Sequence, residues 1–242
     1  MKAERAELVG QVAIVTGGSG AIGRAILDAL SLAGAHAISL DLAGPGEGRE
    51  WVKCDVRYEE SVAAAVHAVH EKTGRLDLVI HAAGISRDSV VWKMAVEDWD
   101  AVQSVNLRGA FLLLRHAIPF LRQQNGGRVV LIGSINGSRG KFGTSAYSAS
   151  KAGLIGLAKS VAREVGRFGI PINVVEPGWV RTPLTDTVPQ SVKDAALAES
   201  LLGTFLETAD VASAVRFLCG PGAARITGQI LRVDGGQFLG GM

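Results

Sequence analysis

The chain alternates short apolar runs with longer segments in which apolar residues recur every three or four positions. The first run, Val12–Thr16, is followed by Ile26, Leu27 and Leu30 at helical spacing. We predict strands at Val12–Thr16, Ala37–Asp41, Trp51–Cys54, Leu76–Ile80, Arg128–Ile132, Ile170–Val175 and Gln229–Val233. Because strands that alternate with helices form parallel sheets with helices on both faces, the pattern predicts an α/β protein with a seven-stranded parallel sheet.

The segments between these runs predict helices and one polar segment that is helical only in parts. Helices are expected at Val62–Val69, at Trp99–Arg122, from Tyr147 onward and at Val211–Leu218. Residues 182–206 are polar and helical only in parts, so we expect them to form a lid over a binding site. The loop Gly44–Gly48 is too short to separate domains, and we find no internal repeat. The sequence therefore predicts a single domain, residues 1–242.

Composition fits a protein with a sizeable core and an ordinary surface. Of 242 residues 48% are hydrophobic, and 25 Lys and Arg stand against 23 Asp and Glu. Because the positive charges are scattered, neither a nucleic acid nor an anionic membrane is indicated as a partner. Cys54 and Cys219 form no metal-ligand motif, and we expect core thiols in a reducing compartment. Without a signal-like N-terminus or an apolar stretch of about 18 residues, we expect a soluble cytoplasmic protein.

Glycines mark the turn between the first predicted strand and the helix after it. Gly18, Gly20 and Gly23 have the spacing that brings backbone close to a pyrophosphate and points helix N–H groups at it. The motif alone is weak evidence. Asp41, however, ends the next strand roughly 20 residues later, where a carboxylate can bind a ribose hydroxyl. Together they predict a doubly wound, Rossmann-like domain that binds a dinucleotide.

Asp41 also bears on which dinucleotide binds. A carboxylate accepts hydrogen bonds from a free ribose 2′-hydroxyl but repels a 2′-phosphate. Leu42 follows at a position where an Arg could have paired with that phosphate, and Gly20 adds no basic side chain. The sequence therefore favours NAD(H) over NADP(H). The alternative is that Asp41 only ends a strand.

Two further strand ends contribute candidate cofactor contacts. Asp55 follows the third strand, where it could receive the adenine amino group or, equally, cap the next helix. His81, Ala82, Ala83 and Gly84 follow the fourth strand. Ala82 and Gly84 are small enough for the backbone to pack against the cofactor, so we expect contacts there.

Tyr147 and Lys151 are one helical turn apart and share a helix face. A phenol titrates near ~10, and an ammonium about 4–6 Å away favours the phenolate, so we expect Lys151 to lower the pKa of Tyr147. Ser134 ends a strand where its hydroxyl could reach the same substrate oxygen. The three side chains predict general acid/base chemistry at a carbonyl or carbinol oxygen. Because such a Tyr–Lys pair often occurs by chance, it gains weight only from the nucleotide-binding motif upstream.

The order and spacing of these motifs resemble the short-chain dehydrogenase/reductase family across essentially the whole chain. The resemblance rests on the glycine turn, Asp55-Val56, Asn106, Ser134, Tyr147, Lys151, Pro177-Gly178 and Val233-Asp234-Gly235-Gly236. It implies that Tyr147 gives or takes the proton of the reacting oxygen and that Ser134 positions this oxygen. It implies that Lys151 lowers the Tyr147 pKa and holds the nicotinamide ribose, while Asn106 supports a water that links Lys151 to solvent.

The resemblance also implies a cofactor site, an assembly and no metal. The residues it places around the cofactor, besides Tyr147 and Lys151, are Gly17, Ser19, Ile22, Asp41, Asp55, Val56, Val180 and Thr182. A homotetramer built through the helices of Asn106 and Tyr147 is expected.

Two positions depart from the family pattern. Ala21 stands where glycine is usual and adds one methyl near the pyrophosphate. His81-Ala82 stands where the family has Asn-Asn, which removes two amides that brace the central strands and the surroundings of Asn106. We expect His81 to be a hydrogen-bonded strand-end histidine rather than a catalyst, because the Tyr147–Lys151 pair already fills the acid/base role.

Within the family, the segments after Ala83 and around Ser134 look most like 3-oxoacyl-thioester reductases, including acetoacetyl-CoA reductases, which commonly prefer NADP(H). The implied activity is NAD(H)-dependent interconversion of a secondary alcohol and a ketone, on a thioester of CoA or an acyl carrier. Alternatives are another secondary alcohol, such as a hydroxy acid, cyclic alcohol or sugar alcohol, and a catalytically silent nucleotide-binding module. Arg139 and Lys141 could attract a carboxylate or the carrier's phosphates, or they could be solvated loop charges.

Overall fold

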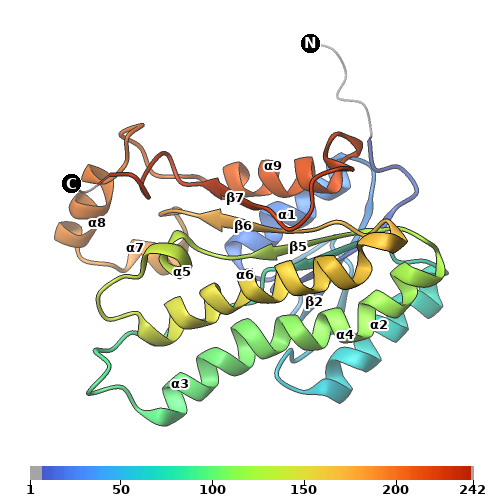
Figure 1. Cartoon of the computed structure of the whole chain (residues 1–242), viewed down its shortest axis with the longest axis horizontal. Helices are drawn as coiled ribbons and strands as arrows, with labels where there is room; N and C mark the ends of the chain where they lie inside the picture. Colours follow the sequence, from blue (N-terminus) through green and yellow to red (C-terminus); the bar gives the residue numbers. More distant parts are fainter. Residues whose placement is uncertain (1–6, 241–242) are drawn as a thin grey trace.

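Seven parallel strands form one sheet at the centre of the protein. The structure, a computed structural model, describes residues 7–240, so the two ends of the expected domain, 1–6 and 241–242, lie outside the described residues. The strands are β1 Val12–Thr16, β2 His36–Asp41, β3 Trp51–Lys53, β4 Leu78–His81, β5 Arg128–Ile132, β6 Ile172–Pro177 and β7 Ile230–Val233. Their order across the sheet is β3-β2-β1-β4-β5-β6-β7 (Figure 1). The predicted seven-stranded parallel sheet is confirmed.

Helices cover both faces of the sheet. The longer ones are α1 Ala21–Leu32, α2 Glu59–Thr73, α3 Val96–Gln103, α4 Gly109–Gln123, α6 Ser145–Val165 and α9 Thr208–Cys219. The shorter elements are η1 Ser104–Arg108, α5 Ile135–Arg139, η2 Gly166–Phe168, α7 Pro183–Asp186, α8 Gln190–Ala198 and η3 Pro221–Ala223. α2, α4 and α6 pack on one face, and α1 and α9 pack on the other (Figure 1). This doubly wound arrangement is the expected Rossmann-like domain.

Some strand bounds differ from the prediction for local reasons. β4 begins at Leu78 rather than at Leu76, and the Asp77 side chain just before it accepts the backbone N–H at the start of β1 at 2.8 Å. β6 begins at Ile172, because Pro171 has no N–H to donate to the sheet. The other strand ends agree with the prediction within one or two residues.

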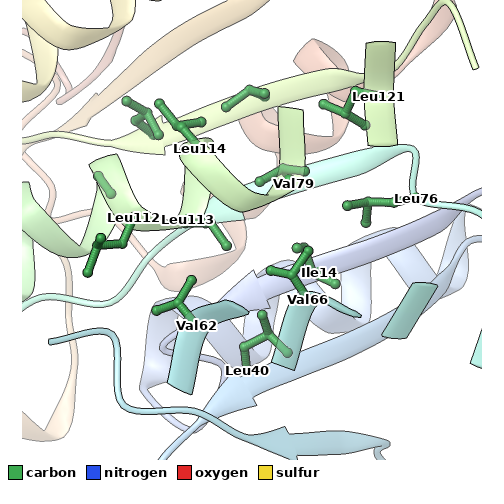
Figure 2. Close-up of a cluster of buried hydrophobic side chains, with 14 of the residues drawn as sticks. Ile14, Leu40, Val62, Val66, Leu76, Val79, Leu112, Leu113, Leu114 and Leu121 are labelled. Carbon is green, nitrogen blue, oxygen red and sulfur yellow. The ribbon is translucent and has the colours of Figure 1, made fainter. Parts of the chain in front are cut away.

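Continuous apolar strands and amphipathic helices form the core. Figure 2 shows the cluster in which side chains of α2 and α4 meet those of the central strands, including Ile14, Leu40, Val66, Val79 and Leu113. All five are fully buried, and burying a side chain of this size stabilises a fold by about 1.5–3 kcal/mol. Packing of α2 and α4 against β1, β2 and β4 therefore fixes these strands, and with them the positions of their carboxyl ends.

The predicted helix at 99–122 is interrupted by a wider turn. The backbone N–H of Gly109 bonds the carbonyl of Ser104, five residues earlier, so η1 is a π turn between α3 and α4. Such turns often mark functional sites, because they move backbone groups out of the regular helical ladder. Asn106 lies inside this turn and is fully buried.

The polar segment 182–206 contains the two short helices α7 and α8. Its base is closed by a bridge between Val180 and Leu206, with the N–H of Arg181 bonded to the Leu206 carbonyl at 2.8 Å. The segment is thus helical in parts, as expected, and its role as a lid stays a prediction. No helix within residues 7–240 is long and apolar enough to cross a membrane.

Candidate active site

The candidate site lies at the carboxyl edge of the sheet, where the strand order reverses between β1 and β4. In doubly wound sheets the ligand binds at this switch point, because the loops on either side lead away in opposite directions. Gly17, Asp41, Ala82 and Ser134 all follow or end strands at this edge. The fold therefore brings together residues that are far apart in the sequence.

The glycine turn after β1 has the shape of a phosphate cradle. Gly17 has φ of 70°, and a Cβ added there would lie 2.6 Å from the backbone nitrogen of Ala83, so only glycine fits. α1 begins directly after Gly20, and none of the described side chains caps it or places an acid in its first turn. Its first N–H groups therefore point at an open position that suits an anion. Ala21 and Ile22 form the first turn of α1, as expected.

Asp41 lies at the end of β2 and is tied to the glycine turn. Its carboxylate accepts the backbone N–H of Ser19 at 2.9 Å and that of Leu42 at 2.6 Å. The Ser19 hydroxyl donates to the carbonyl of Ala43, which joins the two loops a second time. The carboxylate thus sits beside the cradle, where the ribose of a dinucleotide fits, and the residues present fit such a cofactor.

Asp55 is engaged by its neighbour Arg57. The Arg57 guanidinium donates to the Asp55 carboxylate at 2.6 Å and holds the pKa of that carboxyl below its ordinary value. The carboxylate also accepts the N–H of Arg57, which closes a turn, whereas the cap position of α2 belongs to Tyr58. Asp55 therefore does not cap α2, and its contact with adenine stays a prediction. Val56 is buried beside Gly109.

Ser134, Tyr147 and Lys151 converge beside this cradle. Ser134 follows β5 and begins α5, where its Oγ accepts the N–H of Asn136 at 3.2 Å. Tyr147 lies in the first turn of α6 and Lys151 one turn later, with its Nζ 5.6 Å from the centre of the Tyr147 ring. The Lys151 ammonium donates to the carbonyl of Ile132 at 2.7 Å. A hydroxyl, a phenol and an ammonium therefore face one region at the end of β5.

The expectation that Lys151 lowers the pKa of Tyr147 is wrong in this structure. Burial raises the pKa of Tyr147 above its ordinary value, its hydrogen bond with Ser134 offsets part of that rise, and the Asp88 carboxylate adds to it. The Lys151 ammonium is directed to a backbone carbonyl instead, and burial lowers the pKa of Lys151 to about 8. The pKa of Tyr147 is therefore raised above that of a free phenol in this structure, and its role as the proton donor stays a prediction.

Asn106 joins the cluster from the π turn. Its Oδ1 accepts the N–H of Ile85 at 2.8 Å, and its Nδ2 donates to the Ile85 carbonyl at 3.0 Å and to the Ser150 hydroxyl at 2.9 Å. A Cβ added to Gly84 would lie 3.3 Å from Lys151 Nζ and 3.5 Å from Asn106 Oδ1, so the three residues adjoin. The predicted catalytic residues and Gly84 thus occupy one place. Ser150, between Tyr147 and Lys151 in the chain, was not predicted as part of it.

Val180 and Thr182 follow β6 at the same edge. Val180 is buried, and Thr182 begins α7 with its hydroxyl accepting the N–H of Thr185 at 3.3 Å. Their contact with a cofactor stays a prediction. Cys54 and Cys219 are buried free thiols, as expected, and within the described residues no three His, Cys, Asp or Glu side chains are grouped as a metal site would require.

Arg139 is not a solvated loop charge, and its attraction for a substrate carboxylate or phosphate stays a prediction. Its guanidinium lies 2.8 Å from the Glu199 carboxylate and donates to the Gln237 carbonyl at 3.0 Å. The Gln237 side chain is buried and also donates to Glu199, at 3.0 Å. Arg139 therefore ties α5 to the segment that follows α8, a role that no sequence pattern indicated. Lys141 is exposed, with its Nζ 5.3 Å from the centre of the Trp179 ring.

These features define a class of protein. A dinucleotide cradle beside a Ser–Tyr–Lys cluster is what an oxidoreductase needs to bind a nicotinamide and to move a proton at a neighbouring substrate oxygen. Asn106 and Gly84 complete the contact between the two parts of the site.

Comparisons with known proteins agree with this class. A family model described as "Enoyl-(Acyl carrier protein) reductase" matches residues 18–237. The chain is 36% identical over 241 residues to a 3-oxoacyl-[acyl-carrier-protein] reductase of Vibrio cholerae, covering 96% of this chain and 99% of that protein. It is 38% identical over 228 residues to an acetoacetyl-CoA reductase of Synechocystis, covering 93% and 95%. The solved aldohexose dehydrogenase of Thermoplasma acidophilum superposes with a TM-score of 0.92 at 30% identity, covering 98% of each chain.

The chain belongs to the short-chain dehydrogenase/reductase family. It is an oxidoreductase that acts on a carbonyl or CH–OH group, and its family binds a nicotinamide cofactor.

Proposed function

We propose that this protein is an NAD(H)-dependent reductase of 3-oxoacyl thioesters, interconverting them with 3-hydroxyacyl thioesters. The observation that carries the proposal is the convergence of Ser134, Tyr147 and Lys151 beside Gly84, next to a cradle that fits a dinucleotide. The names of the Vibrio cholerae and Synechocystis relatives support a thioester of an acyl carrier or of CoA as substrate.

The chain's own residues account for the proton in the reductive direction. A reduced nicotinamide supplies a hydride to the carbonyl carbon when it is bound. Tyr147, kept protonated by burial, donates its proton to the carbonyl oxygen, and the C=O group becomes CH–OH. Ser134 hydrogen-bonds the same oxygen and orients it. Lys151 binds the ribose of the nicotinamide, and Asn106 supports the water that links Lys151 to solvent, by which the proton is replaced.

Asp41 supports NAD(H) as the cofactor. Its carboxylate faces the cradle between Ser19 and Leu42, with both oxygens already accepting backbone N–H groups. A carboxylate can still accept from a ribose hydroxyl, because each oxygen has two acceptor sites. A 2′-phosphate would meet like charge there, and Leu42 offers no cation to offset it.

A different secondary alcohol is the second candidate. The aldohexose dehydrogenase of Thermoplasma acidophilum has the same fold over nearly the whole chain, so a sugar belongs among the substrates tested. A silent nucleotide-binding module is opposed by the assembled Ser134, Tyr147 and Lys151. An absorbance change that depends on added ketone or alcohol separates the enzyme from such a module.

We further propose that the protein is a homotetramer, with the outer face of α3, η1, α4 and α6 as one interface. A surface groove on this face is lined by Asp100, Gln103, Ser104, Leu107, Arg108, Phe111 and Leu157. The half-exposed Phe111 is an apolar side chain suited to burial by a second copy. Light scattering coupled to size-exclusion chromatography measures the assembled mass, and a monomer contradicts the proposal.

Initial rates with NADH and NADPH, measured side by side on acetoacetyl-CoA and then on ketones, hydroxy acids and aldohexoses, test the function. Faster turnover of acetoacetyl-CoA with NADH supports both parts of the proposal. Turnover of the thioester with NADPH alone contradicts the cofactor assignment. Turnover of other ketones or alcohols alone contradicts the thioester assignment and leaves the oxidoreductase class intact.

A further inference from the structure

His81 stands at the end of β4, fully buried, and touches both halves of the site. Its Nδ1 lies 2.9 Å from the Thr16 hydroxyl at the end of β1, the residue that pairs with it in the sheet. Its Nε2 lies 3.2 Å from the backbone carbonyl of Asn106. The expectation of a hydrogen-bonded strand-end histidine is confirmed, and its partners show what it holds.

The partners allow one protonation state of the imidazole. The Asn106 carbonyl can only accept, so Nε2 must carry a proton. The Thr16 hydroxyl accepts the N–H of Ala83 at 3.3 Å and donates its own proton to Nδ1. Every group in this chain of bonds is then satisfied by a neutral ring in a single tautomer. Burial, together with the nearby Lys151 charge, lowers the pKa of His81 to about 3, in agreement with that state.

The bond to Asn106 reaches the reacting groups through two steps. The Asn106 side chain bonds both backbone groups of Ile85 and the hydroxyl of Ser150. Ser150 in turn donates to the backbone carbonyl of Tyr147 at 2.7 Å. A displacement of the π turn would therefore move Asn106, which adjoins Lys151, and Ser150, which bonds the carbonyl of Tyr147. A misplacement of about 1 Å at a reacting group can cost on the order of 100-fold in rate.

We propose that His81 is a positioning residue of this enzyme, whose neutral imidazole holds the π turn at Asn106 against β1 and β4 and thereby sets the position of Asn106, Ser150 and the start of α6. This inference rests on the proposed function, because it concerns the residues assigned to the reaction there.

Two substitutions separate the bond to Asn106 from the rest of the side chain. His81→Gln keeps an N–H near the position of Nε2, whereas His81→Leu fills a similar volume and offers no N–H to the Asn106 carbonyl. Val79→Ala, which removes two methyls from the same strand in the core, is the matched control for loss of stability alone.

With acetoacetyl-CoA and the preferred nicotinamide, His81→Leu is expected to lower kcat on the order of tenfold or more, with the KM for the nicotinamide changed by about twofold or less. His81→Gln should restore kcat, and Val79→Ala should lower Tm while retaining kcat. In an Asn106→Ala background His81→Leu should cause no further loss, because its effect passes through the Asn106 side chain. A loss of kcat that follows Tm across all three variants, or an additive double variant, overturns the proposal.

Hydrogen exchange keeps this result distinct from a failure of the proposed function. Without any substrate, amides of residues 104–110 should exchange faster in His81→Leu than in the wild type, His81→Gln or Val79→Ala. If the wild type reduces no thioester or ketone, the proposed function fails, and unchanged exchange in His81→Leu then overturns the positioning role of His81 as well. If the wild type is active but the exchange of residues 104–110 is unchanged in His81→Leu, only the positioning role of His81 is contradicted.

Discussion

Replacing Asp41 by Asn tests how the protein chooses its cofactor. The amide has almost the same shape as the carboxylate and keeps an oxygen that can accept the N–H of Ser19. The substitution therefore removes the negative charge beside the cradle and keeps the bond from the Ser19 N–H, while the bond from the Leu42 N–H is lost. A gain for NADPH and a loss for NADH are both expected.

The magnitude follows from the half-buried position of Asp41. Two unit charges about 4 Å apart interact by roughly 4 kcal/mol at an effective dielectric constant of ~20, and solvent at this position reduces that to about 1–2 kcal/mol. Losing the charge from a hydrogen bond to the ribose hydroxyl costs about 1 kcal/mol. The ratio of kcat/KM for NADH to that for NADPH should therefore fall on the order of 30- to 100-fold, since about 1.4 kcal/mol is tenfold.

The assay compares kcat/KM for the two cofactors at saturating acetoacetyl-CoA. Asp28→Asn is the matched control, because it makes the same change of charge on α1. Asp28 pairs with Arg49 at 2.9 Å and takes no part in the bond between Ser19 and Asp41. The control should leave the ratio unchanged. An unchanged ratio in Asp41→Asn, with the enzyme otherwise active, would refute the placement of the carboxylate at the 2′ position.

Three further outcomes follow from the site. Tyr147→Phe should lower kcat by about 10²- to 10⁴-fold while nicotinamide binding, followed by fluorescence, persists; an active Phe variant removes Tyr147 as the proton donor. The pKa of His81 is about 3 in the folded protein and ~6.5 in the unfolded chain, so between these values only the unfolded chain binds the extra proton. The free energy of unfolding should therefore fall by up to about 1.4 kcal/mol per pH unit as the pH decreases from ~6.5 towards 3. Chemical denaturation at pH 7 and pH 5 should show this slope in the wild type and a shallower one in His81→Gln, and equal slopes contradict it. Glu199→Gln, which removes the charge paired with Arg139, should raise the KM for the thioester several-fold and speed proteolysis within 182–206, with NADH binding retained; an unchanged KM argues against that segment as a lid.

Much of the fold follows from local patterns. Buried strands such as β1 and β4 are continuous apolar runs, and the helices between them repeat their apolar residues at helical spacing. The glycine turn before α1 is equally local, because φ of 70° at Gly17 and the approach of Ala83 exclude a side chain there. Tyr147 and Lys151 share a face because one turn of α6 separates them. For these features the geometry follows from the spacing of residues within one helix, strand or turn.

Other features depend on which elements meet. Arg139 bonds Glu199 and Gln237, which lie far along the chain, and nothing around Arg139 in the sequence indicates either partner. The π turn at Asn106 replaces a predicted regular helix, because its side chain is held by Ile85 and Ser150 from other segments. These contacts form only when the sheet and both helix layers are assembled.

Local patterns in the chain were enough to predict the parallel sheet and the glycine turn at the carboxyl end of its first strand, and they predicted Ser134, Tyr147 and Lys151 as one set, which the fold brings together. Periodicity and turn chemistry act over a few residues, so they can be seen in a single chain. The direction in which the pKa of Tyr147 shifts depends on the assembled tertiary structure. The pKa of Tyr147 rises rather than falls, because burial by neighbouring elements outweighs its hydrogen bond with Ser134, while Lys151 is directed to the carbonyl of Ile132. Burial is a property of the assembled core, and spacing along the chain does not contain it.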